Sequence, residues 1–387
     1  MKRVLVLCLA VMLLLGLSVS GSLAAEPIKL GAFFAMSGPA AAIGMPTKLV
    51  AEMVVKKINS EGGINGRNIE LIIGDTEGEP TKAVAVAKKL INVDKVAAVI
   101  GPTRTGTGMA VKKVFDEAQV PVFMTVGGDP VIMGGKFGSF KWIFKSPQRS
   151  SVAVEKVIGY IKKKGWKNVA IITASDSFGR DGQRWLKKLC PEAGLTIVAD
   201  ESFNPRDADM TAQLTKIKGL NPDAVVCWTI GPAGAIVSKN RAQIKLEAPL
   251  IQCHGLPDPK YIELAGPASE GNLMPSTKLM VWEQLPDSDP QKPVIAEFVK
   301  LYNAAGYNKE FPINTHSGYA WDAIYIVADA IKKVGTEPEK LRSAIEQTKG
   351  YVGISGTYNL TPEDHNGLGV DSMVMVKIEG GQWKLAD

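Results

Sequence analysis

The segment of this sequence best suited to bind an anion is a glycine- and threonine-rich run, Gly101-Pro102-Thr103-Arg104-Thr105-Gly106-Thr107-Gly108. It follows an apolar run typical of a buried strand, 96–100, and leads into a helical pattern. The first N–H groups of a helix have no acceptor within the helix, so they attract negative charge, and the hydroxyls of Thr103, Thr105 and Thr107 add to this. A phosphate loop would need lysine where Thr107 stands, so a carboxylate fits better than a nucleotide. The segment predicts a carboxylate site at Thr103, Arg104 and Thr105, with a plain helix cap as the alternative.

Two further segments occupy equivalent places after predicted strands. One is 125–130, Thr-Val-Gly-Gly-Asp-Pro, where glycines let a ligand approach the backbone closely. The other is 176–179, Asp-Ser-Phe-Gly, in the second half of the chain. Ordinary turns are the alternative for the first segment. Phe178 either covers a bound ligand or belongs to the core.

Signals for catalysis and for metal binding are weak. None of His254, His316 and His365 belongs to a metal-ligand spacing. The run 353–356, Gly-Ile-Ser-Gly, lacks the second spacer of a nucleophile elbow, and no dinucleotide fingerprint follows the first strand. We therefore expect a binding protein without a cofactor or metal, and an exported enzyme is the reading favoured least.

Strand and helix patterns alternate along the chain, which predicts parallel sheets with crossover helices. A first series spans 28–126, and a second series of similar length spans 169–253. Ligands bind at the carboxyl ends of strands in such sheets, where the three segments above lie. The pattern predicts two similar α/β lobes.

The N-terminus has the three-part layout of a secretory signal peptide. Met1-Lys2-Arg3 is positive, 4–17 is apolar, and 18–25 offers cleavage after Ala24 or Ala25. A membrane anchor is the alternative, but the apolar run is shorter than the roughly 20 residues that a spanning helix needs. Cys8 is poorly placed for a lipoprotein. We expect an exported, soluble mature protein.

Composition excludes other classes. Hydrophobic residues make up 45% of the 387 residues and charged residues 22%, as in a folded protein. The net charge of +6 is spread out, without a basic stripe interleaved with aromatic residues, so nucleic acid is not an expected partner. The mature chain keeps an odd number of cysteines, Cys190, Cys227 and Cys253. Buried free thiols are expected, although Cys227 and Cys253 fall close enough to pair.

Three phrases of the sequence resemble one known family. They are 35–39 (Ala-Met-Ser-Gly-Pro), 58–67 (Ile-Asn-Ser-Glu-Gly-Gly-Ile-Asn-Gly-Arg) and 100–102 (Ile-Gly-Pro). They look like the leucine/isoleucine/valine-binding protein family, the type I periplasmic binding proteins of branched-chain amino acid ABC transporters. The resemblance implies two Rossmann-like lobes with parallel-rich sheets, joined by a three-crossing hinge, that trap a ligand by clamshell closure. It implies lobe 1 at 26–147 plus 277–355, and lobe 2 at 148–276 plus 356–387.

The resemblance also implies a periplasmic location, an inner-membrane ABC permease as partner and a monomeric binding protein. A sensor subunit that docks on a membrane receptor is the alternative with the same fold. In lobe 1, Thr105 matches the serine that holds the ligand carboxylate, and the backbones of Val126 and Gly128 match a second contact. The family's threonine or serine near Gly128 is missing. Ile43 stands where amino-acid binders often have tyrosine.

In lobe 2, the resemblance implies a departure from the family pattern. Phe178 matches a tyrosine, and Trp228 and Thr229 lie at the matching place on another strand. His254 falls near the acidic residue that pairs with the ligand's ammonium group. The carboxylate contact is thus kept, while the ammonium contact has no negative charge.

Burying an ammonium without a counter-charge costs several kcal/mol. A carboxylate with a neutral tail, aromatic acids included, is therefore as well suited as leucine. His254 is expected to donate a hydrogen bond to a hydroxyl or carbonyl group, or to bind a second anion if it is protonated. A loop histidine with satisfied hydrogen bonds is the alternative.

Overall fold

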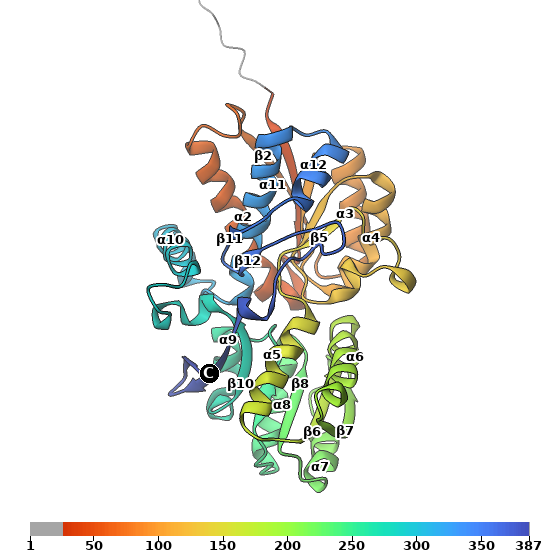
Figure 1. Cartoon of the computed structure of the whole chain (residues 1–387), viewed down its shortest axis with the longest axis vertical. Helices are drawn as coiled ribbons and strands as arrows, with labels where there is room; N and C mark the ends of the chain where they lie inside the picture. Colours follow the sequence, from red (N-terminus) through yellow and green to blue (C-terminus); the bar gives the residue numbers. More distant parts are fainter. Residues whose placement is uncertain (1–25, 387) are drawn as a thin grey trace, which may run out of the picture.

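The computed structural model describes residues 26–386, and these form two α/β lobes, one above the other in Figure 1. The first lobe contains a five-stranded, all-parallel sheet in the order β2-β1-β3-β4-β5. Its strands are β1 (Ile28–Phe34), β2 (Ile69–Asp75), β3 (Ala98–Ile100), β4 (Val122–Met124) and β5 (Ile143–Lys145).

Helices cover both faces of this sheet, because β1 is apolar on both sides. Ile28, Leu30 and Phe34 belong to one core, while Phe33 belongs to the other, as expected from the period of two in a strand. The first core is formed with α2 (Ala41–Ser60), α10 (Gln291–Ala304), α11 (Tyr319–Val334) and α12 (Pro338–Glu346). The second is formed with α3 (Pro80–Asn92) and α4 (Thr105–Ala118).

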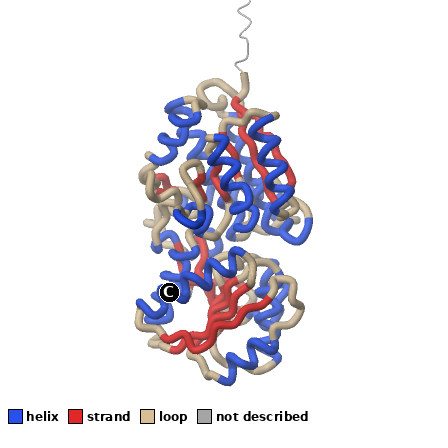
Figure 2. Tube along the Cα trace, turned by 90° about the vertical axis from the view of Figure 1, so that its right-hand side faces the viewer, coloured by secondary structure: helices blue, strands red, loops and turns tan. Residues whose placement is uncertain are grey.

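The second lobe contains a seven-stranded sheet in the order β14-β13-β10-β9-β8-β6-β7, visible edge-on in Figure 2. Its first five strands in the chain are parallel, and the last two are antiparallel. They are β6 (Asn168–Ala174), β7 (Thr196–Phe203), β8 (Ala224–Trp228), β9 (Leu250–Gln252), β10 (Leu273–Thr277), β13 (Met373–Glu379) and β14 (Gln382–Leu385). Its helices are α5 (Ser150–Lys163), α6 (Ser177–Glu192), α7 (Thr211–Gly219), α8 (Pro232–Gln243) and α9 (Pro259–Ala265). This architecture confirms the predicted fold class.

Short elements complete the chain. A two-stranded ribbon is made by β11 (Tyr351–Val352) and β12 (Thr357–Tyr358). The 3-10 helices are η1 (Gly38–Ala40), η2 (Asp129–Ile132), η3 (Gly135–Phe137), η4 (Gly266–Ser269), η5 (Lys278–Gln284), η6 (Tyr307–Lys309), η7 (Thr315–Gly318) and η8 (Val370–Ser372).

The chain passes between the lobes three times: after β5, after β10 and between β12 and β13. Hydrogen bonds join the first and third crossings. The Tyr358 hydroxyl donates to the Ser146 carbonyl (2.7 Å), and the Asn366 side-chain amide donates to the Pro147 carbonyl (2.8 Å). The same Tyr358 proton is shared with a buried carboxylate, because the hydroxyl oxygen also lies 3.0 Å from the Asp322 carboxylate of α11. Hydrogen bonds therefore hold the first and third crossings together, so these two are not independent linkers. The lobe boundaries 147/148, 276/277 and 355/356 stay predictions.

The remaining expectations from the sequence concern the cysteines, membrane spans and the signal peptide. Cys190, Cys227 and Cys253 are buried free thiols, as expected. Across 26–386, no helix has both the length and the apolar character that a membrane span requires. The predicted signal peptide, 1–25, lies outside the described residues.

Candidate functional site

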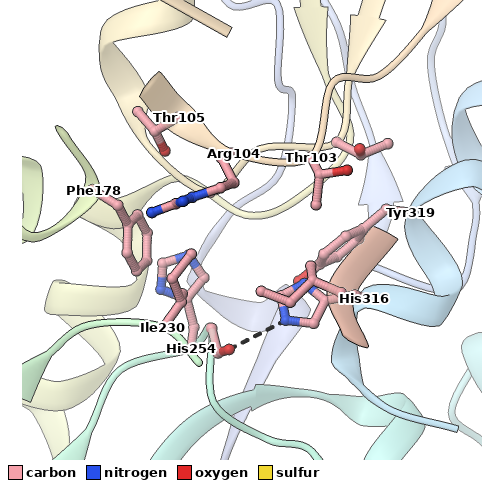
Figure 3. Close-up of a pocket in the computed structure, with 12 residues that line it drawn as sticks. Thr103, Arg104, Thr105, Phe178, Ile230, His254, His316 and Tyr319 are labelled. Atoms are coloured by element: carbon pink, nitrogen blue, oxygen red, sulfur yellow. Dashed lines mark hydrogen bonds between the residues drawn. The ribbon is translucent and has the colours of Figure 1, made fainter. Parts of the chain in front are cut away.

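A cavity lies between the two lobes, at the carboxyl ends of their parallel strands (Figure 3). Its free space is about 360 Å³ when the part open to solvent is included. Its wall is formed by Ile43, Thr103, Arg104, Thr105, Thr125, Gly127, Phe178, Ile230, His254, Gly255, His316 and Tyr319. Six of the ten residues predicted from the sequence are among them: Ile43, Thr103, Arg104, Thr105, Phe178 and His254.

The loop between β3 and α4 provides two buried hydroxyls to this wall. The Thr105 oxygen accepts a hydrogen bond from the Gly128 N–H (3.1 Å), and the Thr103 oxygen accepts one from the Ala35 N–H (3.0 Å). Within 26–386, neither hydroxyl has an acceptor for its own proton. Both can therefore donate to a ligand while their oxygens hold the loop in place.

The start of α4 adds backbone donors beside these hydroxyls. The helix begins at Thr105, and its first N–H groups lack acceptors within the helix. Thr107, which the sequence suggested as a further anion contact, has a different role: its hydroxyl donates to the Arg104 carbonyl (2.7 Å) and accepts from the Arg104 N–H (3.3 Å). Thr107 therefore caps the helix, while Thr103 and Thr105 face the cavity.

The segment after β4 lines the cavity with different residues from those predicted. Val126 is fully buried in the core between the sheet and α4, and the Gly128 N–H bonds to Thr105, so neither residue is on the wall. Their neighbours Thr125 and Gly127 do line the cavity. A Cβ at Gly127 would lie 2.8 Å from a Phe178 ring carbon, so glycine is needed where the lobes meet.

Lobe 2 places Phe178 on the wall through a helix cap. The Asp176 carboxylate accepts hydrogen bonds from the N–H groups of Phe178 (3.1 Å) and Gly179 (2.9 Å), which fixes the start of α6. The Phe178 ring lies 5.5 Å from the His254 ring between centroids. Figure 3 shows these two rings side by side at one end of the cavity.

Trp228 and Thr229 lie behind the wall rather than on it. The Trp228 ring is fully buried against α6, in the space left by Gly182, and its centroid is 5.5 Å from that of His254. The Thr229 carbonyl accepts a hydrogen bond from the Cys253 thiol (2.9 Å). The next residue, Ile230, reaches the cavity instead. Trp228, the last residue of β8, and Thr229 are both buried, so direct contact of either with a ligand stays a prediction.

His254 is the most unusual polar group of the wall. Its side chain is 2% exposed, and neither ring nitrogen has a hydrogen-bond partner among the described residues. Burial, with smaller effects from Lys145 and His316, lowers the pKa of His254 to about 3. The ring is therefore neutral, with one donor and one acceptor nitrogen. The unpartnered nitrogens contradict a loop histidine with satisfied hydrogen bonds, whereas binding of a second anion by a protonated His254 stays a prediction.

His316 and Tyr319 complete the wall, and the sequence analysis missed both as binding residues. The His316 Nε2–H donates to the Gly255 carbonyl at 3.2 Å, across the lobe boundary, and burial lowers the pKa of His316 to about 4. Both residues lie where η7 leads into α11. The Asn314 side chain accepts from the His316 N–H (2.9 Å). Asparagine is a common N-cap residue, so the sequence could have indicated that a helix starts at this place.

Direct polar contacts hold the lobes together around the cavity. The Arg104 guanidinium of lobe 1 lies 3.3 Å from the Asp176 carboxylate of lobe 2. Nearby, the Asp129 N–H donates to the Asp181 carboxylate (2.8 Å), and the Asp129 carboxylate accepts from the Ser150 N–H at the start of α5 (2.6 Å). The structure therefore has the lobes in contact, with the cavity enclosed between them.

Arg104 is the only fully charged side chain on the described wall, and no carboxylate faces the cavity. Within 26–386, no cluster of three or more His, Cys, Asp or Glu side chains is arranged to hold a metal ion. The wall thus combines donors for an anion with apolar and aromatic surface.

Acidification is expected to destabilise the protein through His254. The unfolded histidine titrates near 6.5, whereas the folded pKa is about 3, so between these values only the unfolded chain takes up the proton. The contribution to stability is complete above pH 6.5 and is lost as the pH falls. At pH 5 the loss is about 2 kcal/mol. Urea unfolding at pH 7.5 and pH 5.0 should show a smaller decrease for His254→Gln than for the unmodified protein; equal decreases would contradict the neutral buried histidine.

Comparison with known proteins agrees with this architecture. Residues 27–382 match the family model described as "Periplasmic binding protein". The chain is 25% identical over 363 residues to the Leu/Ile/Val-binding protein homolog 1 of Brucella suis, covering 93% of each chain. It is 26% identical over 331 residues to the leucine-, isoleucine-, valine-, threonine-, and alanine-binding protein of Pseudomonas aeruginosa, covering 84% of each.

Solved structures show the same fold. An extracellular ligand-binding receptor from Rhodopseudomonas palustris HaA2 superposes with a TM-score of 0.84 at 28% identity, covering 94% of this chain and all (100%) of that chain. The branched-chain amino acid transporter substrate-binding protein LivJ from Streptococcus pneumoniae, in complex with isoleucine, superposes with a TM-score of 0.80 at 24% identity, covering 92% and 98%. The resemblance predicted from the sequence is thus confirmed, and the chain belongs to the periplasmic binding protein family.

Proposed function

We propose that this protein is the exported, periplasmic binding component of an ABC transporter of the branched-chain-amino-acid type, and that it closes around a small carboxylate-bearing ligand. The observation that carries the proposal is the pair of buried hydroxyls on the cavity wall, Thr103 and Thr105, whose protons have no acceptor among residues 26–386. The relatives' names as binding proteins support a role without catalysis.

The ligand's carboxylate is best placed against the β3–α4 loop. There it would accept hydrogen bonds from the Thr105 hydroxyl and from the first N–H groups of α4, with Arg104 close by. Hydrogen bonds to a charged group each contribute about 1.5–3 kcal/mol, and the helix dipole adds to them. The tail of the ligand would then lie among Phe178 and Ile230, so amino acids, aliphatic acids and aromatic acids are the candidates.

A thermal-shift screen of the purified protein tests this proposal. Ligands should include amino acids, aliphatic acids and aromatic acids, each paired with its primary amide, which has a similar shape but no charge. A specific carboxylate should raise the melting temperature with its concentration, while its amide should not. Stabilisation by no carboxylate, or equally by the amides, would overturn the proposal.

The permease partner and the periplasmic location rest on membership of the family. Uptake of the ligand identified in the screen should depend on this protein in intact cells. Normal uptake in cells without the protein, together with loss of a signalling response to the same ligand, would favour a sensor subunit instead.

The Arg104–Asp176 ion pair is expected to contribute modestly to closure. Both side chains are partly exposed, so the pair is worth about 0.2–1 kcal/mol. Asp176→Asn keeps an acceptor for the α6 cap but removes the charge, and it should speed ligand dissociation by roughly two- to fivefold in stopped-flow measurements. Asp200→Asn is the control, because the Lys187–Asp200 pair lies within lobe 2. An equal effect of both variants would remove the pair from the closure mechanism.

A further inference from the structure

The lobe-2 end of the cavity, which faces the β3–α4 loop, is unsuited to an ammonium group. Phe178, Ile230 and His254 line this end, and Gly127 of lobe 1 lies against Phe178 and His254. None of these four residues carries a negative charge. The Asp176 carboxylate, which contacts the wall residue Arg104, is already engaged by this arginine and by the cap of α6.

A buried cation behind the lobe-2 end of the cavity makes this end still less suited to an ammonium group. Lys145 is 0% exposed, and its Nζ donates to the carbonyl of Gly127 (2.9 Å), a residue of the wall. Its counter-ion Asp129 lies at 3.9 Å and is occupied by hydrogen bonds from the start of α5. A positive charge on the ligand would meet this cation across Gly127 in a poorly solvated environment, where like charges repel strongly.

His254 instead calls for an uncharged polar partner. Its ring is buried beside the cavity with both nitrogens unpartnered among residues 26–386, and it is neutral. Leaving a buried polar group unpaired is unfavourable, so a site of this kind discriminates strongly against ligands that cannot bond to it. The neighbouring rings of Phe178 and Trp228 hold the imidazole in place, with centroids 5.5 Å away in each case.

Building on the proposed function, we propose that the ligand is a carboxylate without an ammonium group, whose apolar tail bears one hydroxyl or carbonyl oxygen that hydrogen-bonds to His254. The carboxylate lies at Thr105 and the oxygen of the tail at His254. Phe178, Ile230 and Tyr319 enclose the carbon skeleton between the two polar ends (Figure 3). This class includes hydroxylated aromatic acids and oxo acids.

Matched ligand pairs test both parts of this inference by calorimetric titration of the unmodified protein. Leucine and 4-methylpentanoate differ only in the ammonium group, and 4-methylpentanoate should bind at least about tenfold more tightly. Phenylacetate is compared with its 3- and 4-hydroxy derivatives, and pentanoate with 4-oxopentanoate. At least one oxygenated ligand should bind about tenfold or more tightly than its parent.

Variants at His254 test whether the tighter binding of oxygenated ligands depends on this residue. His254→Leu should reduce the advantage of the oxygenated ligand to less than about threefold, whereas His254→Gln, which keeps a donor and an acceptor, should retain most of it. Tighter or equal binding of leucine, or no advantage for any oxygenated ligand, would overturn the inference while leaving a carboxylate-binding protein in place. Binding of none of these acids, nor of any other carboxylate in the screen, would instead overturn the proposed function.

Discussion

Replacing Thr105 with valine is expected to weaken carboxylate binding about 10- to 100-fold, because a hydrogen bond to a charged group contributes about 1.5–3 kcal/mol. Valine keeps the shape of the side chain but has no hydroxyl. The Thr105 hydroxyl is buried on the cavity wall, and its oxygen accepts from the Gly128 N–H, so its proton remains available to donate to a ligand. Calorimetric titration with the carboxylate selected by the thermal-shift screen measures the change in Kd.

Two controls make this result specific. Thr105→Ser keeps the hydroxyl and should remain within about threefold of the unmodified protein. Unfolding of Thr105→Val without ligand should be followed in parallel, because the Gly128 N–H loses its acceptor and some stability is expected to be lost. A folded Thr105→Val protein with unchanged affinity would remove Thr105 from the site.

Replacing Asp322 with alanine is expected to lower the free energy of unfolding by about 2–4 kcal/mol. The Asp322 carboxylate is fully buried and accepts hydrogen bonds from the N–H groups of Ile354 (2.7 Å) and Ser355 (2.8 Å) and from the Tyr358 hydroxyl. Alanine leaves two backbone donors unpaired inside the protein. Tyr358 also bonds to the first crossing, so the damage extends to the hinge.

Urea denaturation at pH 7.5 gives the stability change of Asp322→Ala directly. Asp329→Ala is the matched control, because it lies on the same helix α11 with its side chain exposed and should change stability by less than about 0.5 kcal/mol. If both variants lost the same small amount, the buried carboxylate would have no structural role.

The fold could be predicted from local patterns because each lobe repeats the same strand–helix unit. The apolar runs of β1 and β6 are readable without tertiary information. The carboxylate end of the cavity was also predictable, since one continuous segment, 101–105, supplies its strand end, loop and helix start.

The opposite end of the cavity was only partly predictable. Thr105 of lobe 1 and His254 of lobe 2 line the same cavity because the two lobes meet there, which sequence periodicity does not describe. Trp228 and Ile230 are two residues apart, and which of them reaches the cavity depends on how β8 ends. The roles of such residues are set by tertiary packing.

Small-angle X-ray scattering tests most directly whether the lobes close around a carboxylate. The protein is measured alone and with a saturating concentration of the carboxylate that stabilises it most. We predict that the ligand reduces the radius of gyration, and that scattering calculated from the closed arrangement of 26–386 fits the liganded protein. A scattering curve that does not change on saturation, or a liganded protein that fits only a more open arrangement, would contradict closure around the ligand.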